Sequence, residues 1–188
     1  MTRLEDSEII SLFFERSEQA IEELNRKYGP AVKKTAANIL NDRLDAEECV
    51  NDTYLRVWDS IPPHAPEPLA GYVCAIARNL AVNRYHANHA AKRGGNYDLI
   101  LNEMQECIPS GVNVESDYEA KALSAAINSF LATLSREDRF LFVRRYWYAD
   151  SVAGLAAMTH SSANRISVRL FRLREKLRIT LMKEGFLA

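Results

Sequence analysis

Residues 162–183 have the sequence SANRISVRLFRLREKLRITLMK, which predicts one long amphipathic helix. Its large aliphatic residues recur at the spacing of a single helical face, namely Ile166, Leu170, Leu173 and Leu177. A stripe of cations precedes each of them by one position, namely Arg165, Arg169, Arg172 and Lys176. Because one residue turns a helix by about 100°, an apolar face and a cationic face lie side by side.

The residues just before this helix strengthen the interpretation. A short helix is expected over Val152–Met158, followed by a brief turn and by Ser162 as the N-cap of the long helix. A short helix, a tight turn and a long basic helix form the helix-turn-helix pattern. Such a helix presents arginines to phosphates or to base edges in a major groove, so the pattern predicts binding to duplex DNA. A solvated basic face is the alternative.

The remaining chain also predicts helices, because strict apolar–polar alternation is scarce. Asp6–Glu15 is a short first helix, and a second runs from Ser17 to Leu40 with an interruption or kink at Gly29-Pro30. The Asp45–Asp59 helix should be capped by Asp45, with Glu48 at the capping-box position. Glu67–Lys92 follows a proline-rich loop. In the C-terminal part, we expect Phe140, Val143 and Trp147 to form the apolar side of the helix that Ser135 begins.

Charge is distributed unevenly over the 188 residues, although the formal net charge is only −1. Residues 1–59 carry −5, residues 60–97 carry +3, residues 98–119 carry −6 and residues 120–188 carry +7. Residues 94–116 contain three glycines, a proline and no lysine or arginine, which is typical of a linker with at most a short helical turn at Leu99–Gln105. Two basic blocks on either side of an acidic linker favour contact with a polyanion at two places.

Several other classes of protein are excluded or disfavoured. Cys49, Cys74 and Cys107 are an odd number without close spacing, which argues against a disulfide framework and fits a reducing cytosol. The sequence has no run of about 18 apolar residues, so we expect no membrane-spanning segment. The first residues lack the basic start and apolar core of a signal peptide, so we expect none.

The stretch from Pro68 to Tyr97 contains no acidic residue. Cations there alternate with amides and aromatic rings, at Tyr72, Arg78, Asn79, Asn83 and Arg84. This mixture suits single-stranded nucleic acid, whose phosphates bind arginine and whose unstacked bases bind rings and amides. The alternative is that Tyr72, which falls on an apolar stripe, belongs to the core and the charges are solvated.

The Asp45–Asp59 helix has an acidic polar side, which indicates a solvated face or a protein contact. A metal site that combines these carboxylates with His86 and His89 is a weaker alternative. We find no nucleophile–base arrangement, no phosphate-binding glycine loop and no dinucleotide fingerprint. The sequence therefore predicts a protein that is not an enzyme and needs no metal or cofactor.

Two blocks of sequence resemble the sigma-70 family of RNA polymerase sigma factors. DAEECVNDTYLRVW at 45–58, with YVCAIARNLAVNR at 72–84, resembles region 2. LSREDR at 134–139, with SVRLFRLREKL at 167–177, resembles region 4. Two regions with little besides a linker are typical of the extracytoplasmic-function (ECF) group. The resemblance implies an all-α chain with region 2 at 1–93, an acidic flexible linker at 94–116 and region 4 at 117–188.

The resemblance also implies roles for individual residues. Contacts with the clamp helices of the polymerase's largest subunit would come from Asp45, Glu48, Asn51 and Asp52. Capture of the single-stranded minus-ten element would come from Tyr72, Arg78, Asn79, Asn83 and Arg84. Recognition of the duplex minus-thirty-five element would come from Ser162, Asn164, Arg165, Ser167, Arg169, Phe171, Arg172 and Lys176. The implied partners are core RNA polymerase, including its flap, promoter DNA and an anti-sigma factor, all in the cytoplasm.

One residue departs from the family pattern. His160 occupies the turn before the last helix where glycine is common, so we expect a strained or altered turn. Two further functional hypotheses remain open at this point. One is a stand-alone helix-turn-helix regulator that binds duplex DNA without polymerase, and the other is an all-α metalloenzyme.

Overall fold

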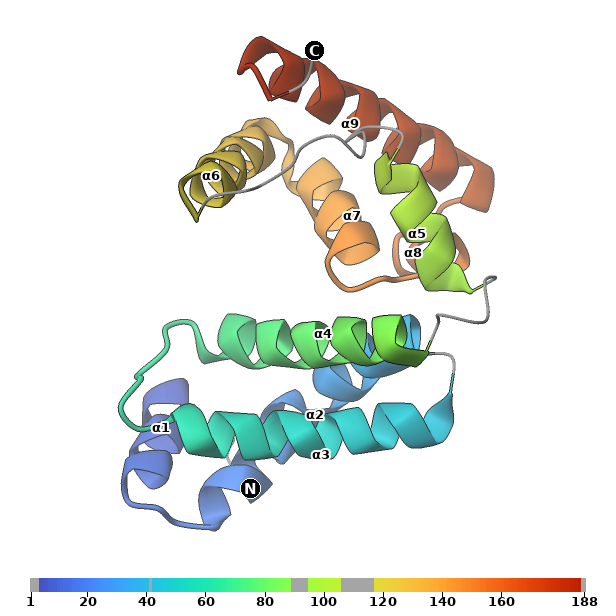
Figure 1. Ribbon diagram of the computed structural model, residues 1–188. Helices are drawn as coiled ribbons and strands as arrows, with labels where there is room; N and C mark the ends of the chain where they lie inside the picture. Colours follow the sequence, from blue (N-terminus) through green and yellow to red (C-terminus); the bar gives the residue numbers. More distant parts are fainter. Residues whose placement is uncertain (1–3, 41, 89–94, 106–116, 187–188) are drawn as a thin grey trace. The chain divides into compact units, whose positions relative to one another are not determined.

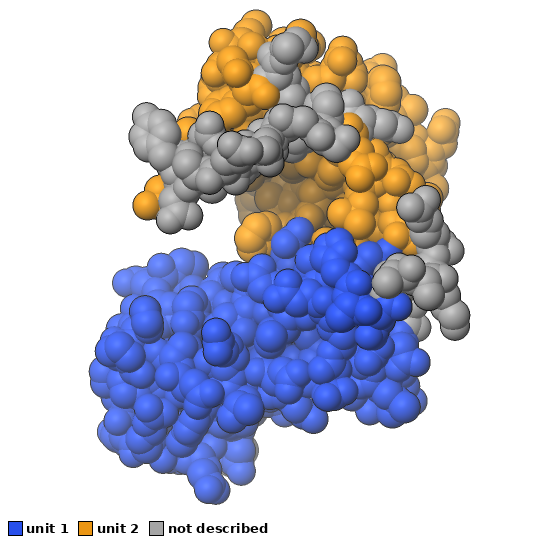
Figure 2. All heavy atoms as spheres, in the orientation of Figure 1, with its two compact units in different colours: residues 1–93 blue, residues 94–188 orange. Residues whose placement is uncertain are grey.

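The computed structural model describes residues 4–40, 42–88, 95–105 and 117–186. Regular structure in these ranges is entirely helical, which confirms the predicted all-α class (Figure 1). The chain divides into two compact units, residues 1–93 and 94–188, which Figure 2 colours separately. None of the described helices is long and apolar enough to cross a bilayer.

Unit 1 contains α1 (Asp6–Phe14), α2 (Gln19–Ile39), α3 (Arg43–Ser60) and α4 (Leu69–Asn88). Helices α2, α3 and α4 all pack against one another, and α1 packs on α2. Their shared core is made of large aliphatic and small side chains, including Leu24, Val32, Ile39, Val57, Leu69 and Val73. This arrangement leaves one long side of α3 and one of α4 available for other contacts.

Helix α2 runs through Pro30 without a break, where we expected an interruption or a kink. Gly29, next to this proline, allows α2 and α3 to pack closely against each other. A Cβ at Gly29 would come within 2.4 Å of the Asn25 side-chain oxygen and 3.3 Å of the Tyr54 hydroxyl. That hydroxyl donates a hydrogen bond to Asn25 at 2.7 Å, so α3 approaches α2 closely at the glycine.

Helix α3 begins two residues earlier than predicted. Asp42, not Asp45, is its N-cap, and the Asp42 carboxylate accepts hydrogen bonds from the backbone amides of Leu44 and Asp45 at 2.8 and 3.0 Å. The prediction of an Asp45 cap was therefore wrong. Both aspartates are acceptable caps in sequence, but the cap at Asp42 frees the Asp45 side chain for contact with α4.

The spacing of the apolar residues between Leu69 and Leu80 predicts one core-facing stripe in this helix, and the observed buried side of α4 differs from it. Leu69 and Val73 are buried as expected, whereas Tyr72, Ile76 and Leu80 are only half-buried. The rest of the buried arc consists of Cys74, Ala77, Ala81 and Tyr85. Small side chains let α2 and α3 approach α4 from two sides, so burial follows helix contacts and not side-chain size.

Unit 2 contains α5 (Asn96–Gln105), α6 (Asp117–Thr133), α7 (Arg136–Tyr146), α8 (Val152–Met158) and α9 (Ala163–Lys183). Helix α9 packs on α6, α7 and α8. Its predicted apolar stripe is buried throughout and continues to Leu181. One cluster joins Ala126 and Phe130 of α6, and Leu134 just after it, to the C-terminal half of α9. A second cluster joins α7 and α8 to the N-terminal half of α9.

The expected apolar side of α7 was wrong. Phe140 and Trp147 are 42% and 43% exposed, and the buried side of α7 consists of Leu141, Phe142 and Arg145. In the first part of the expected linker, where at most a short helical turn at Leu99–Gln105 was predicted, the chain forms the longer helix α5, whose Tyr97 and Ile100 are buried. Residues 106–116 of that linker, with Cys107, lie outside the described residues, as do His89, Lys92 and Arg93.

Candidate nucleic-acid and protein interfaces

The turn between α8 and α9 fixes where the basic helix begins. The amide of Ser161 donates to the Ala156 carbonyl at 2.9 Å, and the amide of His160 donates to the Ala157 carbonyl at 3.5 Å. These two bonds form a Schellman motif, whose central residue adopts left-handed backbone geometry. His160 has φ 51°, the conformation that glycine adopts without steric cost. The turn therefore keeps the geometry that glycine would give, at the expense of local strain.

The N-terminus of α9 is capped as predicted, since Ser162 accepts a hydrogen bond from the Arg165 amide at 3.3 Å. The other proposed minus-thirty-five residues lie outside the buried face of α9. Most of them are exposed, namely Asn164, Arg165, Ser167, Phe171, Arg172 and Lys176. The cationic stripe thus has the accessibility that contact with nucleic acid requires.

Arg169 differs from the other cations of the stripe, because carboxylates of α7 hold it. Its Nε lies 2.6 Å from Asp138 Oδ1 and its Nη2 lies 3.0 Å from Glu137 Oε2. Burial by itself would raise the pKa of Asp138, but hydrogen bonds from Arg169 and Ser135 outweigh burial and lower that pKa. Arg169 therefore links the two helices, and its remaining exposed surface borders the groove described next.

A groove of about 570 Å³ lies where α7, the turn and the start of α9 meet. Its lining includes Arg136 and Phe140 of α7, His160 of the turn, and Arg165 and Arg169 of α9. The exposed Phe140 ring is part of this surface. Sequence analysis did not single out Arg136 and placed Phe140 on the apolar side of its helix, because α7 has several apolar residues and contacts with α8 and α9 decide which of them are buried.

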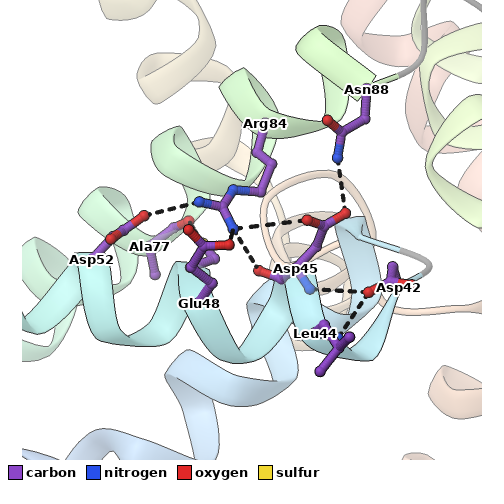
Figure 3. Close-up of polar contacts among 9 residues, drawn as sticks. Asp42, Leu44, Asp45, Glu48, Asp52, Ala77, Arg84 and Asn88 are labelled. Carbon is purple, nitrogen blue, oxygen red and sulfur yellow. Dashed lines mark hydrogen bonds and ion pairs between the residues drawn. The ribbon is translucent and has the colours of Figure 1, made fainter.

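Arg84 of α4 is the centre of a polar cluster on unit 1 (Figure 3). Its guanidinium lies 2.7 Å from Glu48 Oε2 and 3.1 Å from Asp52 Oδ2, and it also donates to the Asp45 carbonyl at 3.3 Å. Asn88, one turn further along α4, donates to the Asp45 carboxylate at 2.8 Å. Hydrogen bonding to Glu48 raises the pKa of Arg84 further.

This cluster joins residues to which different roles were assigned. Three of the four proposed polymerase contacts, at positions 45, 48 and 52, are paired with Arg84, which was proposed to contact DNA. Glu48 nevertheless keeps 66% of its side-chain surface exposed, whereas Arg84 keeps 21%. Arg84 thus binds the carboxylates of α3 from the α4 side and leaves much of the Glu48 side chain exposed.

Asn51, the fourth proposed polymerase contact, belongs to a different surface. It lines a groove of about 690 Å³ between the end of α2 and the start of α3. Lys33 of α2, its C-cap Leu40, and Arg43 and Glu47 of α3 also line this groove. Sequence analysis missed these residues, because only the packing of α2 on α3 brings them together.

The proposed minus-ten residues are distributed around α4. At 100° per residue, Tyr72, Asn79 and Asn83 share one face, opposite the buried arc. Asn79 and Asn83 are exposed and Tyr72 is half-buried. Arg78 and Arg84 lie about 120° from this face on opposite sides, and Arg84 is on the side of α4 that packs against α3. The face of Tyr72, Asn79 and Asn83 therefore combines one aromatic ring with two amides. Arg78 lies to one side of this face, and Arg84 is turned toward α3.

Cys49 lies behind this polar cluster and is buried against α4. Burial raises the pKa of its thiol to about 11. Among the described residues, no group of three or more His, Cys, Asp and Glu side chains could hold a metal ion.

The comparisons with known proteins agree with the sequence resemblance over unit 1. Residues 24–90 match the family described as Sigma-70 region 2. These residues are a sigma-70 region 2 domain. The domain spans most of α2 together with α3 and α4, so it contains the Arg84 cluster, the groove beside Asn51 and the aromatic–amide face of α4. The predicted resemblance to sigma-70 region 2 is thereby confirmed over these residues.

A solved structure with the description "Structure of CnrH in complex with the cytosolic domain of CnrY" is similar over 96% of this chain and 99% of that chain. The sequence identity is 19% and the TM-score is 0.45. Comparison with the curated proteins gives no significant match.

Proposed function

We propose that this chain is a sigma factor of the ECF type, which directs core RNA polymerase to promoters and helps to open the DNA. The observation that carries the proposal is the sigma-70 region 2 domain, followed in the same chain by a helix-turn-helix unit with a cationic face. A stand-alone regulator would need the helix-turn-helix unit and would not need the region 2 domain. A protein of this kind is a regulatory subunit and not an enzyme, and it acts in the bacterial cytoplasm with the polymerase.

In this proposal, the outward side of α3 binds the clamp helices of the largest polymerase subunit. Glu48 offers the most exposed carboxylate of the Arg84 cluster, and Asn51 extends the contact toward the groove beside α2. Docking through carboxylates held by an intramolecular arginine requires little side-chain ordering on binding, which lowers its entropic cost.

The exposed face of α4 receives the unstacked minus-ten strand. Asn79 and Asn83 provide hydrogen bonds to base edges, while Tyr72 provides a ring for stacking. Arg78 contributes a cation for the phosphates on one flank. Arg84 contributes through its position next to α3, because its guanidinium is bound to carboxylates.

Unit 2 supplies region 4, and α9 reads the minus-thirty-five element in the major groove. Arg165, Arg172 and Lys176 provide exposed cations along the helix, and Ser167 adds a hydroxyl at the capped end. Two separate DNA contacts fit the charge distribution of −5, +3, −6 and +7 along the chain. The polymerase flap and an anti-sigma factor are the further partners that we propose from the family resemblance.

Binding to bacterial core RNA polymerase tests this proposal. The purified chain should co-migrate with the core enzyme in size-exclusion chromatography. Glu48→Lys should weaken that complex at least about tenfold, because it places a cation in a carboxylate contact. Glu22→Lys is the matched control, since Glu22 is an exposed acid of α2 away from the cluster. Absence of co-migration, together with salt-sensitive binding to duplex DNA alone, would instead support the stand-alone regulator.

A further inference from the structure

The carboxylate of Glu103 is a centre of the polar contacts between helix α5 and the rest of unit 2. The Arg145 guanidinium binds it at two points, with Nη2 at 2.6 Å from Oε1 and Nε at 3.1 Å from Oε2. The Tyr146 hydroxyl donates to Oε2 at 3.0 Å, and Arg174 Nη1 lies 3.5 Å from the same oxygen. Asn96, at the other end of α5, accepts a hydrogen bond from Arg145 at 3.0 Å and donates one to the Ala149 carbonyl at 2.8 Å.

Arg145 makes this attachment unusual, because only 2% of its side chain is exposed. A buried guanidinium needs a compensating charge, and removal of that charge is strongly unfavourable. Burial by itself would raise the pKa of Glu103, but the hydrogen bonds and charge of Arg145 outweigh burial and lower that pKa. Glu103 is therefore ionised at neutral pH and remains paired with Arg145.

The apolar part of the attachment is small by comparison. Tyr97 and Ile100 of α5 are buried and Met104 packs at the edge of the cluster that α6 forms with α9. That cluster is closed by side chains of α6, α7 and α9, including Phe130, Phe142 and Leu177. Helix α5 is not among the closely packed pairs of helices. Unit 2 thus has a core of its own to which α5 is added.

We propose that α5 is a detachable latch, held on unit 2 by Glu103, whose release lengthens the connection between the two units. With α5 bound, seven residues connect α4 to α5, and Asn88 and Asn96 can be separated by at most about 29 Å. With α5 released, 28 residues connect α4 to α6, and the limit between Asn88 and Asp117 rises to about 100 Å. The latch therefore sets how far apart the two units can bind.

This inference deepens the proposed function and rests on it for its purpose. Promoter elements separated by one or two helical turns lie about 34–70 Å apart along the DNA. A bound latch restricts the chain to the shorter connection, and a released latch gives the reach for both elements. The physical claim about α5 can be tested without polymerase or DNA.

Hydrogen–deuterium exchange of the full chain, followed by mass spectrometry, tests the latch. Glu103→Gln should accelerate exchange of the 96–105 amides about 10–100-fold, because it leaves the buried Arg145 charge without its partner. The amides of α6, α7 and α9 should change by less than about twofold. Glu103→Asp keeps the charge and should recover part of the protection. Glu184→Gln, which neutralises an exposed acid of unit 2, is the control.

Two exchange results would overturn the proposal. Unchanged exchange in α5 would mean that Glu103 does not hold it, and equal acceleration across α5, α6, α7 and α9 would mean that α5 is an integral part of the domain. Small-angle X-ray scattering of the same variants must also show a larger radius of gyration for Glu103→Gln than for Glu184→Gln. An equal radius would refute the effect on reach. These results leave the polymerase-binding test untouched, so the two proposals can fail separately.

Discussion

Replacing Arg84 with methionine tests the view that one arginine organises the carboxylates of α3. Methionine keeps the apolar stem of the side chain and removes the guanidinium that contacts Asp45, Glu48 and Asp52. The three acids then lose their shared partner and repel one another at helical spacings of three and four residues. We expect unit 1 to remain folded and to lose stability.

The magnitude follows from the exposure of the partners. The carboxylates are 33%, 66% and 45% exposed, so each ion pair is worth less than about 1 kcal/mol. Together with the lost hydrogen bond to the Asp45 carbonyl and the new repulsion, the free energy of unfolding should fall by about 2 kcal/mol. For a unit of this size, that loss lowers the melting temperature by about 10 °C.

Tryptophan fluorescence can follow unit 1 separately. Trp58 packs against the Phe13 ring, with ring centroids 6.0 Å apart, and Arg16 lies over its face. In a Trp147→Phe background, Trp58 is the remaining tryptophan of the two in the sequence. Arg43→Met is the control, because Arg43 is 89% exposed and pairs only with Glu47 among the contacts described above. Equal melting temperatures for Arg84→Met and Arg43→Met would refute the reasoning.

Three further predictions concern unit 2. Arg172→Ala should weaken binding to a promoter duplex about 5–150-fold in fluorescence anisotropy, without lowering the melting temperature. Arg169→Ala should lower both the DNA affinity and the melting temperature, because Arg169 also pairs with α7. Equal melting temperatures for the two variants would contradict this distinction. His160→Gly should stabilise unit 2 by about 0.5–1 kcal/mol in thermal unfolding, because glycine adopts positive φ without strain, and a loss of stability would contradict it. The pKa values of Glu103 and Asp138 are lower in the folded chain than in the unfolded chain, so their stabilisation is present above about pH 4.5 and is lost as the pH falls; melting temperatures between pH 3.5 and 7 should show this slope, and Glu103→Gln should reduce it.

The sequence predicts best where one helix packs on a single core. The stripe of Ile166, Leu170, Leu173 and Leu177 is buried as its spacing indicates, because α9 presents one face to all three of its partners. The periodicity of α4 was less informative. Helices α2 and α3 pack against α4 from two different sides, so its buried arc is wider and is filled by small residues such as Ala77 and Ala81.

Long-range ion pairs account for most of what the sequence could not predict. Arg145 is separated from Glu103 by 42 residues, and nothing in the local pattern of α7 distinguishes a buried arginine from the exposed Phe140. The acidic composition of residues 98–119 favoured a linker, although one of its acids neutralises that arginine. Composition records charge, but only the tertiary structure shows which charges are paired.

The same limit applies to the candidate site. Sequence analysis grouped the cations of α4 and those of α9, and it assigned Arg84 and Arg169 to DNA with the others. The structure shows that both bind carboxylates of a neighbouring helix. Which of the remaining exposed residues contact DNA stays a prediction, and the variants above address it.

Run-off transcription is the most direct test of the central claim. The purified chain, added to bacterial core RNA polymerase on a library of promoter fragments, should give new start sites that the core enzyme alone does not give. Upstream of these starts, two short sequence elements should recur at a fixed spacing. Transcription that does not depend on the added chain, or starts that share no upstream elements, would contradict the assignment as a promoter-recognition subunit.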